Sequence, residues 1–108
     1  MWHRLCSLGE IAEDGVTRFE VGGVAVLATL VGGECRAYPP RCPHMAEPLE
    51  LSGLCEEGVL TCTKHLWQWD LRDGAAMGSA ERALQLYPTR RDGSDVWIEI
   101  AKELTYDE

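Results

Sequence analysis

The sequence predicts an all-β protein, an antiparallel sandwich or barrel from which one segment of different composition projects. Three observations support this prediction. Short runs rich in β-branched residues are separated by turn signals at intervals of about 8 to 12 residues. Helix signals are few. Proline, cysteine, histidine, tryptophan and glycine concentrate between about residues 40 and 83, where β-branched residues become scarce.

The expected elements can be justified in chain order. Ser7 and Glu10 have the spacing of a capping box, which predicts a single turn of helix near the N-terminus. The expected strands are bounded by turn-forming pairs of the Gly-Gly and Asp-Gly type, and the pair Gly32-Gly33 predicts a hairpin. The segments predicted to be strands are 16–21, 24–31, a short strand from Cys35, 58–62, 67–71 and 96–100.

The change in composition predicts one domain built from two parts. A length of 108 residues suits a single domain with a modest core. We expect residues 1–39 and 84–108 to form a β base, and residues 40–83 to form an inserted subdomain. Functional residues tend to lie on loops that a rigid scaffold positions, so this subdomain is where we expect the site.

Charge and hydropathy narrow the function. The chain has 10 Lys and Arg residues against 18 Asp and Glu residues, a formal net charge of −8, which disfavours a nucleic-acid partner. The negative charge of the chain is instead expected to attract a partner protein that has a basic patch. No apolar run approaches the length of a membrane span, and the N-terminal residues do not resemble a signal peptide. We therefore expect no membrane association and a cytoplasmic location.

Two short motifs carry the chemistry. They are Cys42-x-His44 and Cys62-x-x-His65, each with one thiol and one imidazole. Zinc is one candidate, because Cys₂His₂ sites are common, although such sites usually group two cysteines and two histidines separately. A catalytic Cys–His pair is a second candidate, but it does not explain why the arrangement occurs twice.

A [2Fe-2S] cluster of mixed ligation is the third candidate, and it explains the duplication. Two cysteines hold one iron of such a cluster and two histidines hold the other, so each loop would send one ligand to each iron. The other three cysteines stand alone among apolar neighbours, and their odd total argues against a disulfide framework. We expect these three to be buried, unreactive thiols: Cys6, Cys35 and Cys55.

The segments "CPH" and "CTKH" together resemble the signature of the Rieske proteins in all four ligand positions and in their separation. The resemblance implies the Rieske fold and one [2Fe-2S] cluster. It implies that Cys42 and Cys62 bind the inner iron, that His44 and His65 bind the outer iron, and that residues 40–83 form the cluster-binding subdomain.

Differences from the high-potential Rieske proteins are informative. Those proteins have a further cysteine in each loop, at positions that correspond to Glu47 and Lys64 here, and these two cysteines form a disulfide. They also have serine and tyrosine hydroxyls near the cluster, where this chain has Trp67 and Trp69. Without these hydroxyl donors we expect a midpoint potential near the low end of the Rieske range, about −150 mV.

A low-potential Rieske domain of this length resembles the ferredoxin components of bacterial multicomponent oxygenases. That resemblance implies an electron carrier that is not itself an enzyme, passing one electron at a time from a flavin-containing NADH reductase to a terminal oxygenase. Leu66 and the segment "HLWQWD" look more like the toluene-monooxygenase type, which implies a diiron hydroxylase and aromatic hydrocarbon catabolism. The alternatives are a ferredoxin of a ring-hydroxylating dioxygenase and the small Rieske subunit of a nitrite reductase. We expect a monomer.

Side chains near the motifs have further expected roles. Met45 and Trp67 are candidates for shielding the cluster from water, and Trp67 and Glu47 are candidates for partner docking, with plain packing as the alternative for the tryptophan. Four glutamates between the motifs are candidates for an acidic rim that meets a basic partner: Glu47, Glu50, Glu56 and Glu57.

Overall fold

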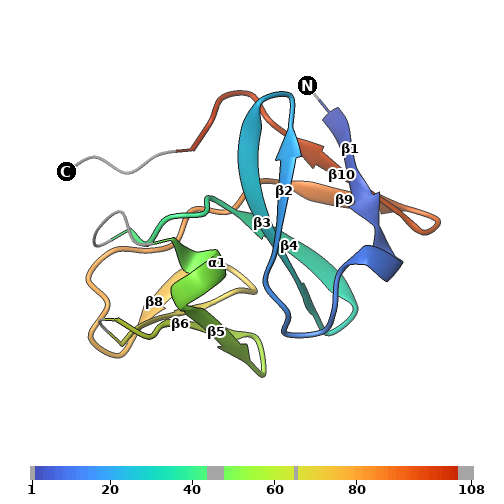
Figure 1. Cartoon of the computed structure of the whole chain (residues 1–108). Helices are drawn as coiled ribbons and strands as arrows, with labels where there is room; N and C mark the ends of the chain where they lie inside the picture. The colour runs from blue at the N-terminus through green and yellow to red at the C-terminus, as the bar shows by residue number, and fades with distance from the viewer. Residues whose placement is uncertain (1, 44–47, 65, 105–108) are drawn as a thin grey trace.

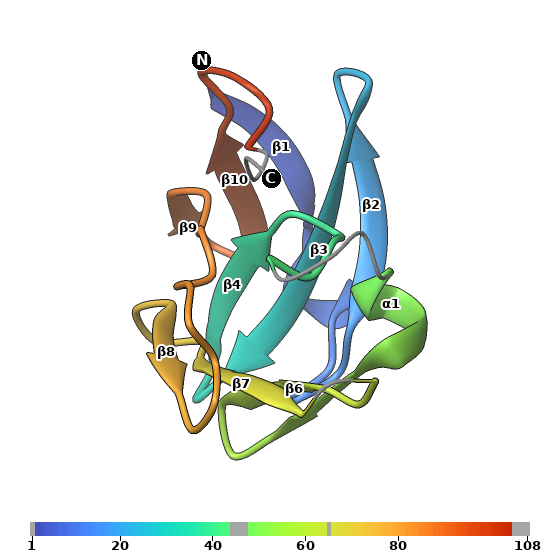
Figure 2. The same cartoon turned by 90° about the vertical axis from the view of Figure 1, so that its left-hand side faces the viewer.

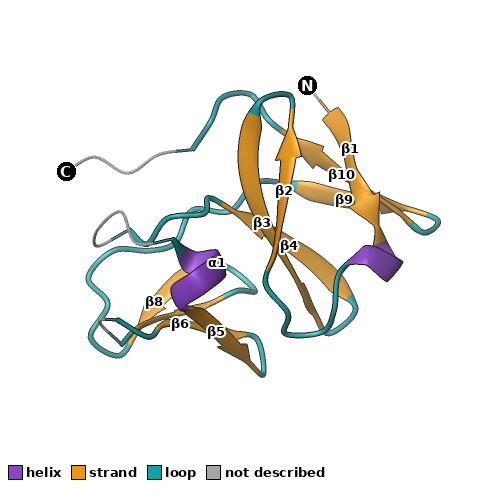
Figure 3. Cartoon of the chain, viewed as in Figure 1, coloured by secondary structure: helices purple, strands orange, loops and turns teal. Residues whose placement is uncertain are grey.

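The computed structural model describes residues 2–43, 48–64 and 66–104. The described chain contains three antiparallel sheets (Figures 1 and 3). Helical structure is limited to two short elements, the 3₁₀ turn η1 (Leu8–Glu10) and the helix α1 (Leu49–Ser52). The strands are β1 (Trp2–Ser7), β2 (Thr17–Val21), β3 (Val24–Val31), β4 (Glu34–Tyr38), β5 (Gly53–Glu56), β6 (Val59–Cys62), β7 (Trp67–Asp70), β8 (Ala75–Met77), β9 (Thr89–Asp92) and β10 (Asp95–Glu99).

The order of strands separates the middle of the chain from its two ends. One three-stranded sheet has the order β1-β10-β9, so it joins the N-terminal strand to the last two strands. The second three-stranded sheet is the meander β2-β3-β4. The remaining strands form a four-stranded meander, β5-β6-β7-β8, which lies apart from the other two sheets in both views (Figures 1 and 2).

The sheet β2-β3-β4 is the middle layer, because its two faces contribute to two different hydrophobic cores. Val26, Ala28 and Ala37 pack with residues of β1 and β10 in one core. Leu27 and Tyr38, on the opposite face, pack with residues of the four-stranded sheet in the other. Burial on both faces explains why β3 reads as a continuous apolar run rather than an alternating one.

Most expected strands are confirmed, and the differences have physical reasons. The capping box is confirmed, since the backbone N–H of Ser7 donates a hydrogen bond of 2.8 Å to the Glu10 carboxylate. Four strands were not predicted from the sequence: β1, β5, β8 and β9. β8 is exposed throughout and β9 has the sequence TRRD, so neither shows the alternation that marks a half-buried strand. No helix of the described chain is long and apolar enough to cross a membrane.

Candidate metal centre

Cys62 lies at the last position of β6, where a short loop leads into β7. Its Cα pairs with that of Trp67 across the β6–β7 ladder. The backbone N–H of Leu66 donates a hydrogen bond of 2.7 Å to the carbonyl oxygen of Cys62, which closes the loop. Leu66 has a φ of +61°, a left-handed conformation that is strained for a bulky L-residue. His65, the second predicted histidine ligand, lies outside the described residues.

The first loop is held together at its two ends. The backbone N–H of Leu49 donates a hydrogen bond of 2.8 Å to the carbonyl oxygen of Pro40, and Arg41 forms an isolated antiparallel bridge with Pro48. Cys42 therefore lies at the neck of a loop whose ends are fixed side by side. Three predicted site residues of this loop lie outside the described ranges: His44, Met45 and Glu47.

The two loops bring Cys42 and Cys62 into one hydrophobic core. The two residues are 2% and 0% exposed, and they share this core with Trp67 and Trp69. All five cysteines of the chain are described, and none forms a disulfide. A thiolate in such an apolar setting is costly unless a cation compensates its charge, so this pair of thiols suits iron ligation. Within the described ranges, no three His, Cys, Asp or Glu side chains form a metal-binding group.

A third segment, between β8 and β9, contacts both β7 and the first loop, and no local pattern in the sequence predicts these contacts. The indole Nε1–H of Trp69 donates a hydrogen bond of 2.9 Å to the carbonyl oxygen of Arg82. The guanidinium Nη1 of Arg82 lies 3.4 Å from the carbonyl oxygen of Pro43, the residue that follows Cys42. Arg82 therefore links β7 to the first loop.

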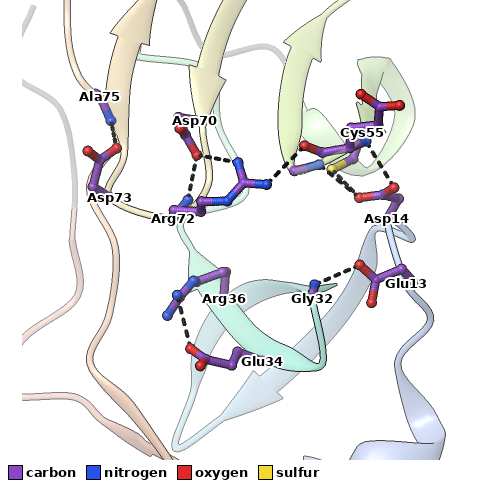
Figure 4. Close-up of polar contacts among 12 residues, drawn as sticks. Glu13, Asp14, Gly32, Glu34, Arg36, Cys55, Asp70, Arg72, Asp73 and Ala75 are labelled. Atoms are coloured by element: carbon purple, nitrogen blue, oxygen red, sulfur yellow. Dashed lines mark hydrogen bonds and ion pairs between the residues drawn. The ribbon is translucent and has the colours of Figure 1, made fainter.

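At the opposite end of the four-stranded sheet, Asp14 fixes the turn between β5 and β6 (Figure 4). Its carboxylate accepts hydrogen bonds from the backbone N–H groups of Glu57 at 3.0 Å and Gly58 at 3.1 Å, and from the Cys55 thiol at 3.4 Å. The hydrogen bond from Gly58 is the main cause that lowers the Asp14 pKa below its usual value. The turn needs φ values of +51° at Glu57 and +79° at Gly58. A Cβ on Gly58 would lie 3.0 Å from Val31.

Two members of the expected acidic rim, Glu56 and Glu57, do not lie beside the predicted cluster, and a third, Glu47, lies outside the described residues. In the β5–β6 pairing, Gly53 lies opposite Cys62 and Glu56 lies opposite Val59, so Glu56 and Glu57 are at the end of the hairpin remote from Cys62. Glu50 forms an ion pair of 2.8 Å with Arg18 of β2, which offsets its charge. These glutamates lie between the two motifs along the chain, but the β5–β6 hairpin places its turn at the far end of the sheet.

Trp67 is packed into the core rather than displayed on the surface. It is 7% exposed, and its ring meets that of Trp69 edge to face, with centroids 6.3 Å apart and an interplanar angle of 67°. Edge-to-face pairs of this kind stabilise cores beyond the area that they bury. The packing alternative is therefore the stronger reading for this residue, and its shielding role remains a prediction.

The three cysteines outside the motifs are buried, as expected. Burial raises the pKa of the Cys6 thiol to about 11, and it raises those of Cys35 and Cys55 to about 12. Nearby carboxylates, Glu10 for Cys6 and Asp14 for Cys55, act in the same direction. Thiols with raised pKa values form little thiolate near neutral pH, which makes them poor nucleophiles and poor ligands in this state.

Comparison with known proteins places the chain in a family. Residues 1–88 match the Rieske [2Fe-2S] domain. The chain is 39% identical over 106 residues to the methanesulfonate monooxygenase ferredoxin subunit of Methylosulfonomonas methylovora, covering 98% of this chain and 86% of that protein. It is 32% identical over 94 residues to the ferredoxin component of the alkene monooxygenase system of Xanthobacter autotrophicus, covering 87% and 77%.

The fold agrees with the sequence match. The ferredoxin of carbazole 1,9a-dioxygenase from Nocardioides aromaticivorans superposes with a TM-score of 0.79 at 22% identity, covering 91% of this chain and 96% of that one. The predicted all-β Rieske fold is thus confirmed. Buried thiols from two loops of such a fold suit the single [2Fe-2S] cluster of the family. The chain belongs to the Rieske [2Fe-2S] family, as a ferredoxin that carries electrons on one cluster.

Proposed function

We propose that this ferredoxin carries single electrons from a flavin-containing, NADH-dependent reductase to a terminal monooxygenase. The observation that carries the proposal is the likeness over nearly the whole chain to a monooxygenase ferredoxin subunit, at 39% identity. The second relative belongs to a different monooxygenase system. Because these relatives serve systems with different substrates, the reaction class is better supported than the substrate.

The proposed cluster ligands are Cys42 and Cys62 for the inner iron and His44 and His65 for the outer iron. The burial of both cysteines in one core, at the mouths of two adjacent loops, supports the first pair. The position of each histidine within three residues of a buried cysteine supports the second pair. When bound, the cluster accepts and releases one electron, and the loops orient and shelter it.

We further propose that the oxygenase is a diiron enzyme acting on aromatic or alkene substrates. The similarity to the alkene monooxygenase ferredoxin supports this choice, as does the resemblance of the segment "HLWQWD" to the toluene-monooxygenase type. We also propose a base of residues 1–39 and 84–108, a cluster-binding subdomain of residues 40–83, and a cytoplasmic monomer. Five thiols without a disulfide are consistent with a reducing compartment.

Reconstitution tests the function directly. The purified ferredoxin is combined with NADH, a flavin reductase and, in separate assays, a diiron monooxygenase, a mononuclear-iron dioxygenase and a nitrite reductase. We expect ferredoxin-dependent product only with the monooxygenase. Product formed only with the dioxygenase or only with the nitrite reductase would replace this proposal with the corresponding alternative. Omission of the ferredoxin from each assay is the control.

A further inference from the structure

Leu66 has a strained backbone conformation and an exposed side chain, so it contributes little to the hydrophobic core. Its φ is +61° and its residue surface is 67% exposed. Glycine would adopt this conformation without steric cost, whereas a leucine in it is strained. The side chain lies at the mouth of the β6–β7 loop, beside predicted ligand His65. A strained backbone that keeps a large apolar side chain exposed points to a functional role for that residue, here contact with a partner.

A second exposed leucine lies close to the same loop. Leu51 of α1 is 81% exposed. The residue after it, Ser52, accepts two hydrogen bonds through its carbonyl oxygen from Thr63, one from the backbone N–H at 2.8 Å and one from the hydroxyl at 2.7 Å. These bonds place α1 directly against the loop that carries Leu66. The two leucines thus provide apolar surface near the predicted cluster.

Basic side chains accompany this apolar surface. Arg41 precedes Cys42 in the sequence, and Lys64 lies between Cys62 and Leu66. Both residues are exposed, as is Arg82. Neither Arg41 nor Lys64 forms an ion pair with another described residue. Arg82 is held against the first loop by its contact with the Pro43 carbonyl oxygen. Arg41, Lys64 and Arg82 together form the basic rim.

Acidic groups of the four-stranded sheet gather mainly at the other end. Glu56 and Asp70 both lie opposite Val59, at the turn end, where the backbone N–H of Glu57 bonds to Asp14 and Asp70 is paired with Arg72 (Figure 4). Among the described residues 39–43, 63–64, 66 and 80–84, the only carboxylate is that of Glu81. In a chain with a net charge of −8, the described residues of these segments thus carry three cationic side chains and one carboxylate, while Glu50 of the neighbouring α1 is paired with Arg18 and Glu47 lies outside the described residues. Figure 2 looks onto this end, with the segment between β8 and β9 running down one side.

We propose that the basic rim of Arg41, Lys64 and Arg82, around an apolar centre at Leu66, docks an acidic surface of the terminal oxygenase. An apolar centre with a polar rim is the usual anatomy of a protein interface. Charge complementarity at the rim raises the association rate, while the net negative charge of the rest of the chain disfavours other orientations. The proposal rests on the proposed function, since it names the surface through which that electron transfer occurs. It reverses the expectation that an acidic surface of this protein meets a basic partner.

Small oxidants of known charge test the sign of this surface without any partner protein. The dithionite-reduced ferredoxin is oxidised in a stopped-flow instrument by the anion tris(oxalato)cobaltate(III) and, separately, by the cation hexaamminecobalt(III). We expect the rate with the anion to fall as ionic strength rises, although the protein is anionic overall. In the variant Arg41→Gln/Lys64→Gln/Arg82→Gln this trend should reverse. A rate with the anion that rises with ionic strength in the wild type would overturn the proposal.

The oxygenase that the wild-type ferredoxin reduces provides the second test. At low ionic strength we expect the triple variant to transfer its electron about tenfold more slowly or worse, with the deficit shrinking at high salt. Lys102→Gln, which changes the net charge by one at an exposed residue outside the basic rim, is the matched control for one charge and should be unchanged. Leu66→Gly should also slow transfer about tenfold, while its urea unfolding midpoint stays equal or rises, because the strain is relieved. Visible and EPR spectra check that each variant retains its cluster.

Each contrary result is informative. An unchanged or faster rate in the triple variant would reject the basic rim, even if the wild type reduces the oxygenase normally. Slower electron transfer only from the reductase would assign the rim to the reductase and reject the oxygenase as its occupant. If the wild type reduces no oxygenase at all, the proposed function itself fails, and this proposal with it.

Discussion

The Asp14 carboxylate accepts a hydrogen bond of 3.1 Å from the backbone N–H of Gly58, a residue 44 positions away in the chain. This bond joins the loop before β2 to the tip of the β5–β6 hairpin (Figure 4). It fixes the turn end of the four-stranded sheet against the middle sheet, and so helps to define where the other end, with Cys62, is held.

Loss of the Asp14 charge should destabilise the fold modestly. Asn tolerates the φ of +58° at this position, so Asp14→Asn tests the hydrogen bonds with little change in backbone strain. We expect a decrease of about 1 kcal/mol in the free energy of unfolding, because hydrogen bonds to a charged acceptor are stronger than those to a neutral amide. Urea denaturation measures it, with the exposed Glu20→Gln as control. An unchanged midpoint would show that the bonds are replaced by water at no cost.

The same carboxylate should make stability depend on acid pH. Hydrogen bonding from Gly58 lowers the Asp14 pKa in the folded protein, so the ionised form stabilises the fold. This contribution is fully present above the unfolded-state pKa, near 3.8, and it is lost as pH falls through the lower folded-state pKa. The difference in urea midpoint between wild type and Asp14→Asn should therefore shrink between pH 6 and pH 3. A difference that is constant over this range would assign the effect to packing.

Substitution of a motif cysteine should abolish cluster binding. Cys42→Ser and Cys62→Ser each remove one of the two thiolates proposed to bind the inner iron, and we expect iron and acid-labile sulfide to fall to near zero in both. Cys6→Ala removes a buried thiol from the other core and should retain both. Chemical analysis of freshly purified protein, together with visible absorption, reports the result. Full iron content in either serine variant would reject that residue as a ligand.

The midpoint potential should lie near the low end of the Rieske range, about −150 mV. High-potential members of the family use two hydroxyl donors where this chain has Trp67 and Trp69. The structure adds a reason why Trp69 is no substitute: its indole N–H already donates to the carbonyl oxygen of Arg82. Potentiometric titration followed by EPR measures the value. A midpoint near +300 mV would contradict this account of the cluster environment.

The thiols outside the motifs should resist alkylation in the native protein. With pKa values raised to about 11 or 12, Cys6, Cys35 and Cys55 have a thiolate fraction of about 10⁻³ or less at pH 8. Iodoacetamide at that pH should modify all three only after unfolding, as mass spectrometry of tryptic peptides would show. Rapid modification of any of them in the folded state would mean that its segment opens locally.

Local sequence signals predicted much of this fold. The Gly32-Gly33 turn, the apolar run of β3 and the capping box of Ser7 and Glu10 each act over a few residues, and each is confirmed. The strands that were missed, such as β8 and β9, form through pairing with a neighbour and bury little of their own surface. Their polar composition does not indicate that they are strands or which strand they pair with.

The site residues likewise fall into those that local sequence predicts and those that it does not. The cysteines of the two motifs could be recognised because ligand spacing is a local property. The roles of Asp14, Arg18 and Arg82 could not, since each contacts a segment more than 30 residues away. The prediction that Glu56 and Glu57 belong to an acidic rim near the cluster was wrong for a related reason. Glu56 is near Cys62 in the sequence, but the β5–β6 hairpin separates them along the length of the sheet.

Cys42 and Cys62, from which the two predicted ligand loops start, share one hydrophobic core at one end of the molecule. If the donor and the acceptor of electrons both use that end, the two cannot occupy the protein together. Each catalytic cycle then requires departure from one partner before arrival at the next. Very tight binding to either partner would slow electron transfer to the other, so a moderate affinity for both is expected. An inactive oxygenase added in excess should therefore inhibit turnover by occupying the ferredoxin.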